Sequence, residues 1–274
     1  VLIISPLLIS RIALTTGLFY FLNDYFENGH GILNNLPYWI APLAYTVFLF
    51  LFDDFSRFAV HKAFHQIPFL WIIHKVHHSA EYLTPLTVYR THPLEGLIFT
   101  LRSILVQSIT ISSFVFLFGT KIDLMTIYGV SFLLFIFNLT GANLRHSHFH
   151  ISYGTFLEKI FISPAQHQIH HSISAKYKDK NFGSILAVWD LLGRSLYLAK
   201  FNQKIKFGIK NNQNLYLHKL STVYVYPVIE LGNWIVANSI SKKRNNRLDN
   251  KIVLTSKIAS TIIFFCASFA GIFG

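Results

Sequence analysis

Histidines are concentrated in the middle of this chain, in patterns that suit metal binding. The sequence holds 14 histidines, and 12 of them fall between positions 61 and 171. Eleven belong to four short stretches, "HKAFH", "HKVHHS", "HSHFH" and "HQIHHS". On a helix, residues three or four positions apart share one face, so HxxxH and HxxHH can each aim imidazoles at one point. The candidate metal ligands are His61, His65, His74, His77, His78, His146, His148, His150, His167, His170 and His171.

The chemistry of imidazole explains why such a set would be kept together. Each neutral ring has one donor and one acceptor nitrogen, and each buried group without a partner costs about 1–3 kcal/mol. Metal ions remove that cost, because neutral imidazole is a good ligand. One four-coordinate zinc cannot use all these rings, so we expect two ions with about five nitrogen ligands each. Ligand type alone leaves iron, zinc, copper and nickel open. We expect no catalytic side chain beyond the metal centre and no site for an organic cofactor.

The second ring nitrogen of each ligand needs a hydrogen-bond partner, and we name Asn143, Gln166 and Asp190 as candidates. In "HSHFH", helical spacing favours the pair His146 and His150, and we expect at least one of the three histidines there not to bind metal.

The three remaining histidines are not expected to bind metal. His30 and His218 are isolated, and we expect them to be structural. His92, in "RTHPLE", is expected to start a helix before Pro93 or to support the site by a hydrogen bond rather than to ligate metal.

Local signals place these motifs at helix ends. Pro68 separates the first motif from the second, which predicts that one helix ends and another begins there. In "SPAQHQIHHS", Ser163 is a suitable N-cap, Pro164 a suitable first helical residue, and Gln166 completes a capping box. The three histidines of that motif then fall in the first two turns of a helix.

The composition predicts a membrane protein. The 274 residues are 52% hydrophobic and 13% charged, with a mean hydropathy of +0.43, which is too apolar for an ordinary soluble domain. The stretch 222–240 is a weaker candidate because Pro227, Glu230 and Asn233 interrupt it, and a re-entrant or interfacial helix stays open there. We therefore expect an all-α integral membrane protein with about four to six transmembrane helices and a cytosolic helical cap that carries the dimetal site. The stronger candidate spans are 2–22, 38–55, 96–118, 122–142 and 252–274.

The distribution of charge predicts the orientation. Residues 143–220 contain eleven Lys and Arg against three acids. Residues 23–37 contain no Lys or Arg, but they include Asp24 and Glu27. By the positive-inside rule the basic loops face the cytoplasm, so both HxxHH motifs lie on that side of the membrane. The net charge of +12 is explained in the same way, and we expect no nucleic-acid partner. The single cysteine, Cys266, allows no disulfide within this sequence and no Cys-based metal cluster.

These predictions divide the chain into five segments. They are N-terminal transmembrane helices in 1–60, a cytosolic segment with the first two motifs in 61–95, a transmembrane hairpin in 96–142, a cytosolic segment with the last two motifs in 143–215, and membrane-associated helices in 216–274.

The order "HKAFH", "HKVHHS", "HQIHHS", set between and after spans, resembles the fatty acid hydroxylase/sterol desaturase superfamily. "NFGSILAVWDLLGRSLYL" is similar to the segment that follows the last motif in that family. "NLRHSH" followed by "SPAQHQIHHS" is most similar to bacterial members, and distantly to alkylglycerol monooxygenase.

The resemblance implies a membrane enzyme that binds two iron ions, for which zinc can substitute in a purified sample. It implies activation of O2 with electrons from a separate donor protein, and attack on a C–H bond of a lipid such as a sterol, a fatty acyl chain, an ether lipid or an amino lipid. Hydroxylation, desaturation and ether cleavage all remain open at this stage, as does the oligomeric state. It also implies the inner membrane of a bacterium, with the histidine site on the cytoplasmic side.

Other classes of protein can carry clustered histidines. A metal transporter would place them at mid-membrane depth, whereas here they follow the spans. A haem-binding cytochrome needs pairs on facing spans and has no use for two HxxHH motifs. A metal-binding or non-catalytic subunit of a membrane complex, and a metal transporter, stay the alternatives.

Overall fold

The computed structural model describes residues 4–26, 29–122, 127, 144–200, 205–209 and 219–244. Within these residues the regular structure is helical, apart from one isolated β-bridge between Phe161 and Leu186. The expected all-α class is therefore confirmed for the described part of the chain. The expected spans 122–142, save Ile122 and Ile127, and 252–274 lie outside it.

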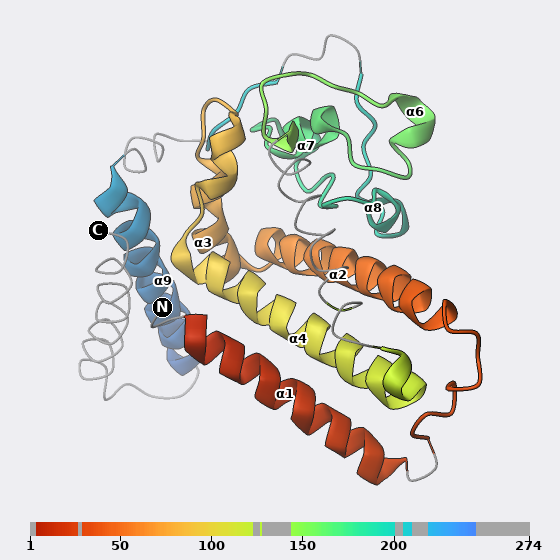
Figure 1. Ribbon diagram of the computed structural model, residues 1–274. Helices are drawn as coiled ribbons and strands as arrows, with labels where there is room; N and C mark the ends of the chain where they lie inside the picture. The colour runs from red at the N-terminus through yellow and green to blue at the C-terminus, as the bar shows by residue number, and fades with distance from the viewer. Residues whose placement is uncertain are drawn as a thin grey trace.

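Three long helices lie side by side in Figure 1, with α4 (Pro93–Phe118) between α1 (Ile4–Tyr25) and α2 (Ile40–Gln66). The contact between α2 and α4 is apolar and includes Tyr45 and Phe114, whose ring centroids are 5.5 Å apart. Small polar residues join α1 to α4, where Ser112 Oγ donates to the backbone oxygen of Thr15 at 2.7 Å. Serines at such a contact let two helix backbones approach closely and satisfy their hydroxyls there.

The helix α4 is the membrane-span candidate of the described residues, because it alone among them combines sufficient length with sufficient hydropathy and few charges. Within the expected stretches 2–22 and 38–55, residues 4–22 are helical in α1 and residues 40–55 are helical in α2. The number of transmembrane helices and the side of the membrane on which the site lies stay predictions.

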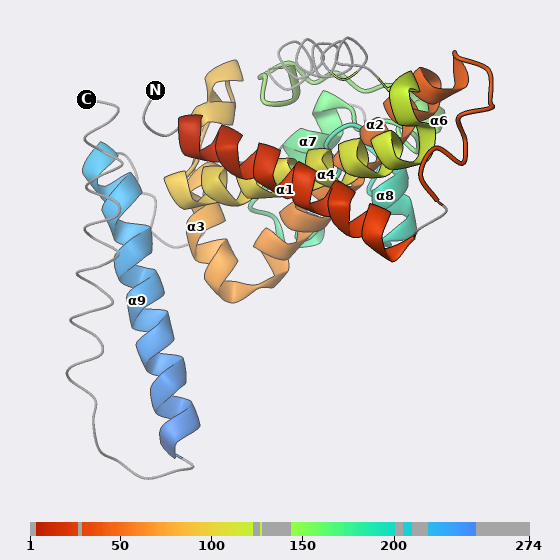
Figure 2. The ribbon, with the colours of Figure 1, turned by 60° about the horizontal axis from the view of Figure 1, so that its bottom comes forward.

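The helix α3 (Pro68–His78) follows α2 after a break at Ile67. Its Lys75 forms an ion pair with Glu230 of α9 (Leu220–Arg244), a helix that contains Pro227. Figure 2 shows α9 extending away from the layer of α1, α2 and α4. Two 3-10 helices, η1 (Pro85–Tyr89) and η2 (Gly119–Lys121), flank α4.

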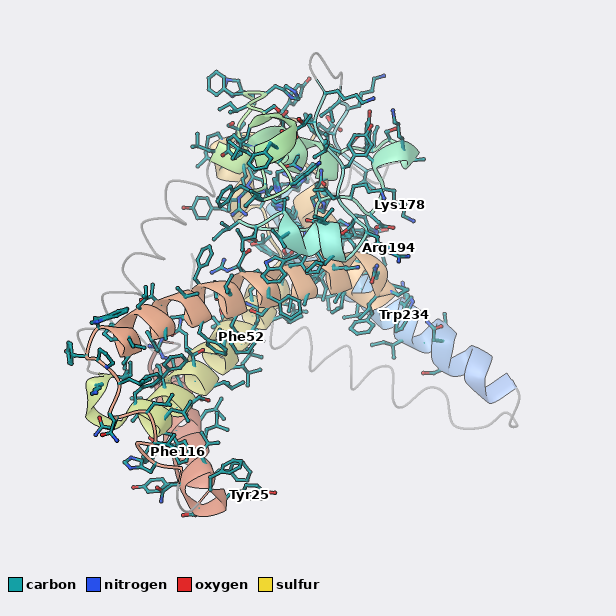
Figure 3. All side chains as sticks on the ribbon, turned by 90° about the vertical axis from the view of Figure 1, so that its right-hand side faces the viewer. Tyr25, Phe52, Phe116, Lys178, Arg194 and Trp234 are labelled. Atoms are coloured by element: carbon teal, nitrogen blue, oxygen red, sulfur yellow. The ribbon has the colours of Figure 1, made fainter. Side chains whose placement is uncertain are left out.

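Residues 144–200 form a head of short elements, which Figures 1 and 3 show on the opposite side of α2 from α1. Few helices of this length are stable alone, so tertiary contacts must hold them. The elements of the head are α6 (Gly154–Leu157), α7 (Pro164–His170), η3 (Ala175–Tyr177) and α8 (Val188–Leu192).

A buried carboxylate on α2 anchors the head. Asp54 is fully buried and accepts from the backbone N–H groups of Ile185 and Leu186, each at 2.9 Å, and from Trp189 Nε1 at 2.9 Å. The neighbouring Asp53 accepts instead from Arg102 of α4 at 2.8 Å. Within the described part of the chain neither aspartate contacts a histidine, so their role is to join elements.

Replacing Asp54 with alanine is expected to lower the free energy of unfolding by about 2–4 kcal/mol, because three buried donors lose their charged acceptor. Thermal unfolding of the purified protein measures this change. Asp24→Ala is the matched control: it removes an exposed carboxylate of α1 and should leave the unfolding temperature unchanged. An equal shift in both variants would contradict the anchoring role.

Candidate metal centre

The first two motifs lie where α2 gives way to α3. His61 and His65 are in the last two turns of α2, and Pro68 is the first residue of α3, as the sequence predicts. A proline is tolerated at this position because its missing N–H has no helical acceptor. The turn brings the second motif, on α3, back against the first.

The last motif lies on α7, and its predicted cap is confirmed. Ser163 accepts from the Gln166 N–H at 3.2 Å, and the Ser163 N–H donates to the Gln166 side chain at 2.9 Å. This capping box fixes the first turn. It therefore sets the direction in which His167 and His170 leave the helix.

Nine of the eleven predicted ligands converge into two adjoining groups. In each group, one nitrogen from every ring lies within 4.8 Å of the corresponding nitrogen of every other ring. The two groups also touch, because the rings of His78 and His171 stack with centroids 4.3 Å apart. The first histidine group is His61, His65, His74, His78 and His170, and the second histidine group is His77, His146, His167 and His171.

Hydrogen bonds assign the proton in several of these rings. His61 Nδ1 lies 2.8 Å from the backbone oxygen of Phe182, and His170 Nδ1 lies 2.9 Å from that of Lys180. His77 Nδ1 lies 3.3 Å from the backbone oxygen of Arg90. A carbonyl oxygen can only accept, so Nδ1 carries the hydrogen in each ring. The Nε2 lone pair is thus left for a metal, which is the usual arrangement of a histidine ligand with an outer partner.

The loop that supplies two of these carbonyls is held in an unusual backbone conformation. Asn181 has a φ of 56°, a region that Asn adopts more readily than most residues. Its side chain donates to the backbone oxygen of Gln166 at 3.1 Å. Asp190 then accepts from the Phe182 and Gly183 N–H groups. These contacts fix the carbonyls against His61 and His170.

The inner nitrogens show that metal fits this cluster. Among the described residues, Nε2 of His65, His74, His78 and His170 is buried without a hydrogen-bond partner. Each such atom costs about 1–3 kcal/mol unless something binds it. All four belong to the first histidine group, so their lone pairs meet at one place.

In the second histidine group, Nε2 of His146 lies 3.1 Å from Nε2 of His77 and 2.9 Å from Nε2 of His167. His167 Nε2 lies 3.2 Å from His171 Nε2. Neutral rings cannot satisfy this many contacts between the same nitrogen type, because each ring has a single hydrogen. A cation among them would satisfy all four.

Burial keeps these rings neutral. It lowers the pKa of His61 to about 4 and, together with neighbouring histidines, lowers the pKa of His78 and His171 well below the ordinary value. A metal therefore does not have to displace protons at neutral pH, which favours its binding.

Glu95 is a part of the site that sequence reasoning missed. It is 3% exposed, and its Oε1 accepts from His74 Nδ1 at 2.9 Å. Its other oxygen is buried without a hydrogen-bond partner among the described residues. A single acid has no spacing pattern that would identify it. However, a carboxylate in the first turn of the most apolar helix, α4, is unusual, and this position could have marked Glu95 as a candidate.

Two of the suggested outer partners do not contact a histidine ring. Gln166 serves the α7 cap and Asp190 holds the loop at Phe182, whereas Asn143 lies outside the described residues. His92 is the N-cap of α4, where Nδ1 accepts from the Leu94 N–H at 3.2 Å. Its predicted role as a helix-start residue is thus confirmed.

The other two predicted ligands, His148 and His150, lie outside both groups. Residues 146–150 are not helical, so the expected helical pairing of His146 with His150 is wrong. His150 contacts the side chain of Gln168, at 3.2 Å, and both histidines line a separate pocket of about 410 Å³. His30 packs on Phe19 with ring centroids 5.8 Å apart, and His218 lies outside the described residues.

A second cavity, of about 240 Å³, reaches both histidine groups. Its wall also includes Arg57, Arg145, Glu95 and Phe99. This cavity is the candidate place for a reacting molecule, because the larger pocket touches neither group. The histidines that line it are His61, His74, His77, His146 and His167.

Comparison with known families agrees with this geometry. Residues 46–195 match the model of the fatty acid hydroxylase family. The chain belongs to that family. The matched range contains both histidine groups, Glu95 and the loop that follows the last motif. The resemblance inferred from the motifs is therefore confirmed.

The curated relatives within this superfamily are distant. Alkylglycerol monooxygenase of Danio rerio is 30% identical over 160 residues, which are 58% of this chain and 32% of that protein. The Caenorhabditis elegans protein of that name is 24% identical over 178 residues, 65% of this chain and 32% of the relative. Human lathosterol oxidase is 24% identical over 184 residues, 66% of this chain and 55% of the relative. The chain thus spans about a third to a half of their lengths. No solved structure matches the chain.

Proposed function

We propose that this member of the fatty acid hydroxylase family is an O2-dependent, membrane-bound di-iron oxidoreductase that hydroxylates or desaturates a C–H bond of a lipid. The observation that carries the proposal is the convergence of nine imidazoles, seven of them buried, into two adjoining groups around one cavity. Two groups of five and four rings suit two cations, and nitrogen ligands suit iron. When bound, such a pair of ions supplies the activation of O2, with electrons from a separate donor protein.

The protein orients the histidine rings and limits the access of water to the site. The Phe182 and Lys180 carbonyls orient His61 and His170, and Glu95 orients His74. The nine rings leave little access for water, since seven of them are buried. A site of this kind directs reactive chemistry toward a bound substrate and away from solvent. The relatives named as monooxygenase and lathosterol oxidase support oxidation of a lipid here.

The test compares the lipids of cells that carry the gene, cells that lack it, and cells that carry a His74→Ala variant. We expect one lipid class to differ by one oxygen atom or two hydrogen atoms only where the wild-type chain is present. Identical lipids in all three strains, with the wild-type protein loaded with iron, would contradict the proposal. Such a result would favour a metal-binding subunit instead.

A further inference from the structure

Two arginines line the cavity that touches both histidine groups. Arg57 lies on α2, four residues before His61, and Arg145 directly precedes His146. Both line the cavity of about 240 Å³. Neither arginine belongs to a histidine motif, and neither is needed to hold metal.

Arg57 is only partly neutralised. Its Nε donates to Asp53 Oδ2 at 2.7 Å, and among the described residues its two terminal nitrogens have no acceptor. Asp53 cannot serve Arg57 alone, because its other oxygen forms an ion pair with Arg102 at 2.8 Å. One carboxylate is thus shared by two cations.

Arg145 has no carboxylate partner among the described residues. Its guanidinium donates a hydrogen bond to the backbone oxygen of Ser184. Both oxygens of the nearby Asp54 already accept from the 185–189 segment. Arg145 is therefore a half-buried cation that only a neutral carbonyl satisfies.

Among the described residues, Glu95 is paired with His74 and not with an arginine. It lines the same cavity, but it is hydrogen-bonded to His74, and no ion pair of the described residues joins it to either arginine. Like charges that face one low-dielectric space repel each other unless an anion lies between them. A guanidinium offers a planar pair of donors that matches a carboxylate or a phosphate.

We propose that this cavity binds a lipid with an anionic head, a carboxylate or a phosphate, between Arg57 and Arg145. The inference rests on the proposed function and narrows it. Because the same small cavity reaches five ligand-candidate histidines, the oxidised carbon is one close to the anionic head. Sterols and carotenoids, whose polar groups are neutral, are then not the substrates.

The test is displacement of a fluorescent fatty acid, cis-parinaric acid, from the iron-loaded protein in detergent without O2. The competitors share one chain length and differ in the head: octadecanoic acid, octadecyl phosphate and octadecanol. We expect the two anions to compete about tenfold or more better than the alcohol, the effect of one or two charge-assisted hydrogen bonds. In Arg57→Gln and in Arg145→Gln, the two anions should compete no more than about threefold better than the alcohol, because part of the charge-assisted hydrogen bonding is lost.

Three controls keep the proposal falsifiable. Arg194→Gln removes an exposed arginine of the head, labelled in Figure 3, and should keep the full preference. Acetate and inorganic phosphate should displace the probe poorly, and equal displacement by these chainless anions would overturn the lipid assignment. The same assay on the metal-free protein should keep the preference. The last comparison uses the variant that combines Arg57→Gln with Arg145→Gln. If the preference for anions requires iron and survives in that variant, the metal binds the anionic head, and the proposal is overturned.

The outcome is separable from the proposed function. Iron content and product formation are measured without reference to the arginines. If the protein holds two irons and oxidises a lipid but binds octadecanol as well as octadecanoic acid, the anionic-head inference fails and the oxidoreductase proposal stands.

Discussion

Replacing His171 with alanine is expected to remove metal from the second histidine group and to abolish lipid oxidation. The ring is 2% exposed, contacts His167 through Nε2 at 3.2 Å, and stacks on His78 of the first histidine group. It therefore links the two groups. Changes of outer partners already cost about 10–100-fold in metal affinity or activity, so loss of a ligand should leave below about 1% of the turnover. Metal analysis and product formation measure the two effects.

His148→Ala is the matched control, since this histidine comes from the adjacent motif but is exposed and outside both groups. It should keep full metal content and activity. Membrane insertion and thermal unfolding of both variants show whether the chain still folds. Unchanged metal content in a folded His171→Ala protein would refute its assignment as a ligand.

Replacing Glu95 with alanine should weaken metal binding in the first histidine group by about 10–100-fold, because His74 then loses the acceptor that fixes its proton on Nδ1. Glu95→Gln is more informative. Burial raises the pKa of the Glu95 carboxyl well above its usual range, but a cation bound beside it favours the ionised form. The amide oxygen of the variant can still accept from His74, so the metal should stay bound, but this negative charge is lost. The reduction potential of the iron should therefore rise in Glu95→Gln, as measured by anaerobic redox titration.

The control for Glu95 is Glu81→Gln, which makes the same chemical change at an exposed position outside both histidine groups. It should leave both metal content and reduction potential unaltered. If Glu95→Ala keeps wild-type metal affinity and Glu95→Gln keeps the wild-type potential, Glu95 is a structural residue and not a partner of the centre.

Much of the site could be predicted because its signals are local. Helical spacing in "HKVHHS" and "HQIHHS" places imidazoles on one face, and the cap at Ser163 fixes where α7 starts. Proline at position 68 forces the break that folds α3 back onto α2. These features depend on residues within one or two turns of each other, and the structure confirms them.

The parts that could not be predicted depend on residues far apart in the sequence. His61 and His170 donate to backbone carbonyls of Phe182 and Lys180, which carry no side-chain pattern. Glu95 reaches His74 only because α4 packs beside α3. His150 diverges from His146 because a turn replaces the expected helix, so a periodicity argument does not apply there.

The membrane arrangement illustrates a different limit. Hydropathy predicts spans over 38–55 and 96–118, and helices are found at both places. The helix α2 continues past its apolar part to carry Asp53, Asp54 and the first motif. Its charged half serves the head, and these charges keep α2 from qualifying as a span by composition, whereas α4 qualifies.

The most direct test of the central claim is the iron content of the wild-type protein purified without O2, measured together with its Mössbauer spectrum. The two histidine groups predict two irons per chain, high-spin ferrous and bound by nitrogen, which become spin-coupled on oxidation because the groups adjoin. A chain that holds a single iron, or two irons that stay uncoupled in the oxidised protein, would contradict a shared dimetal centre.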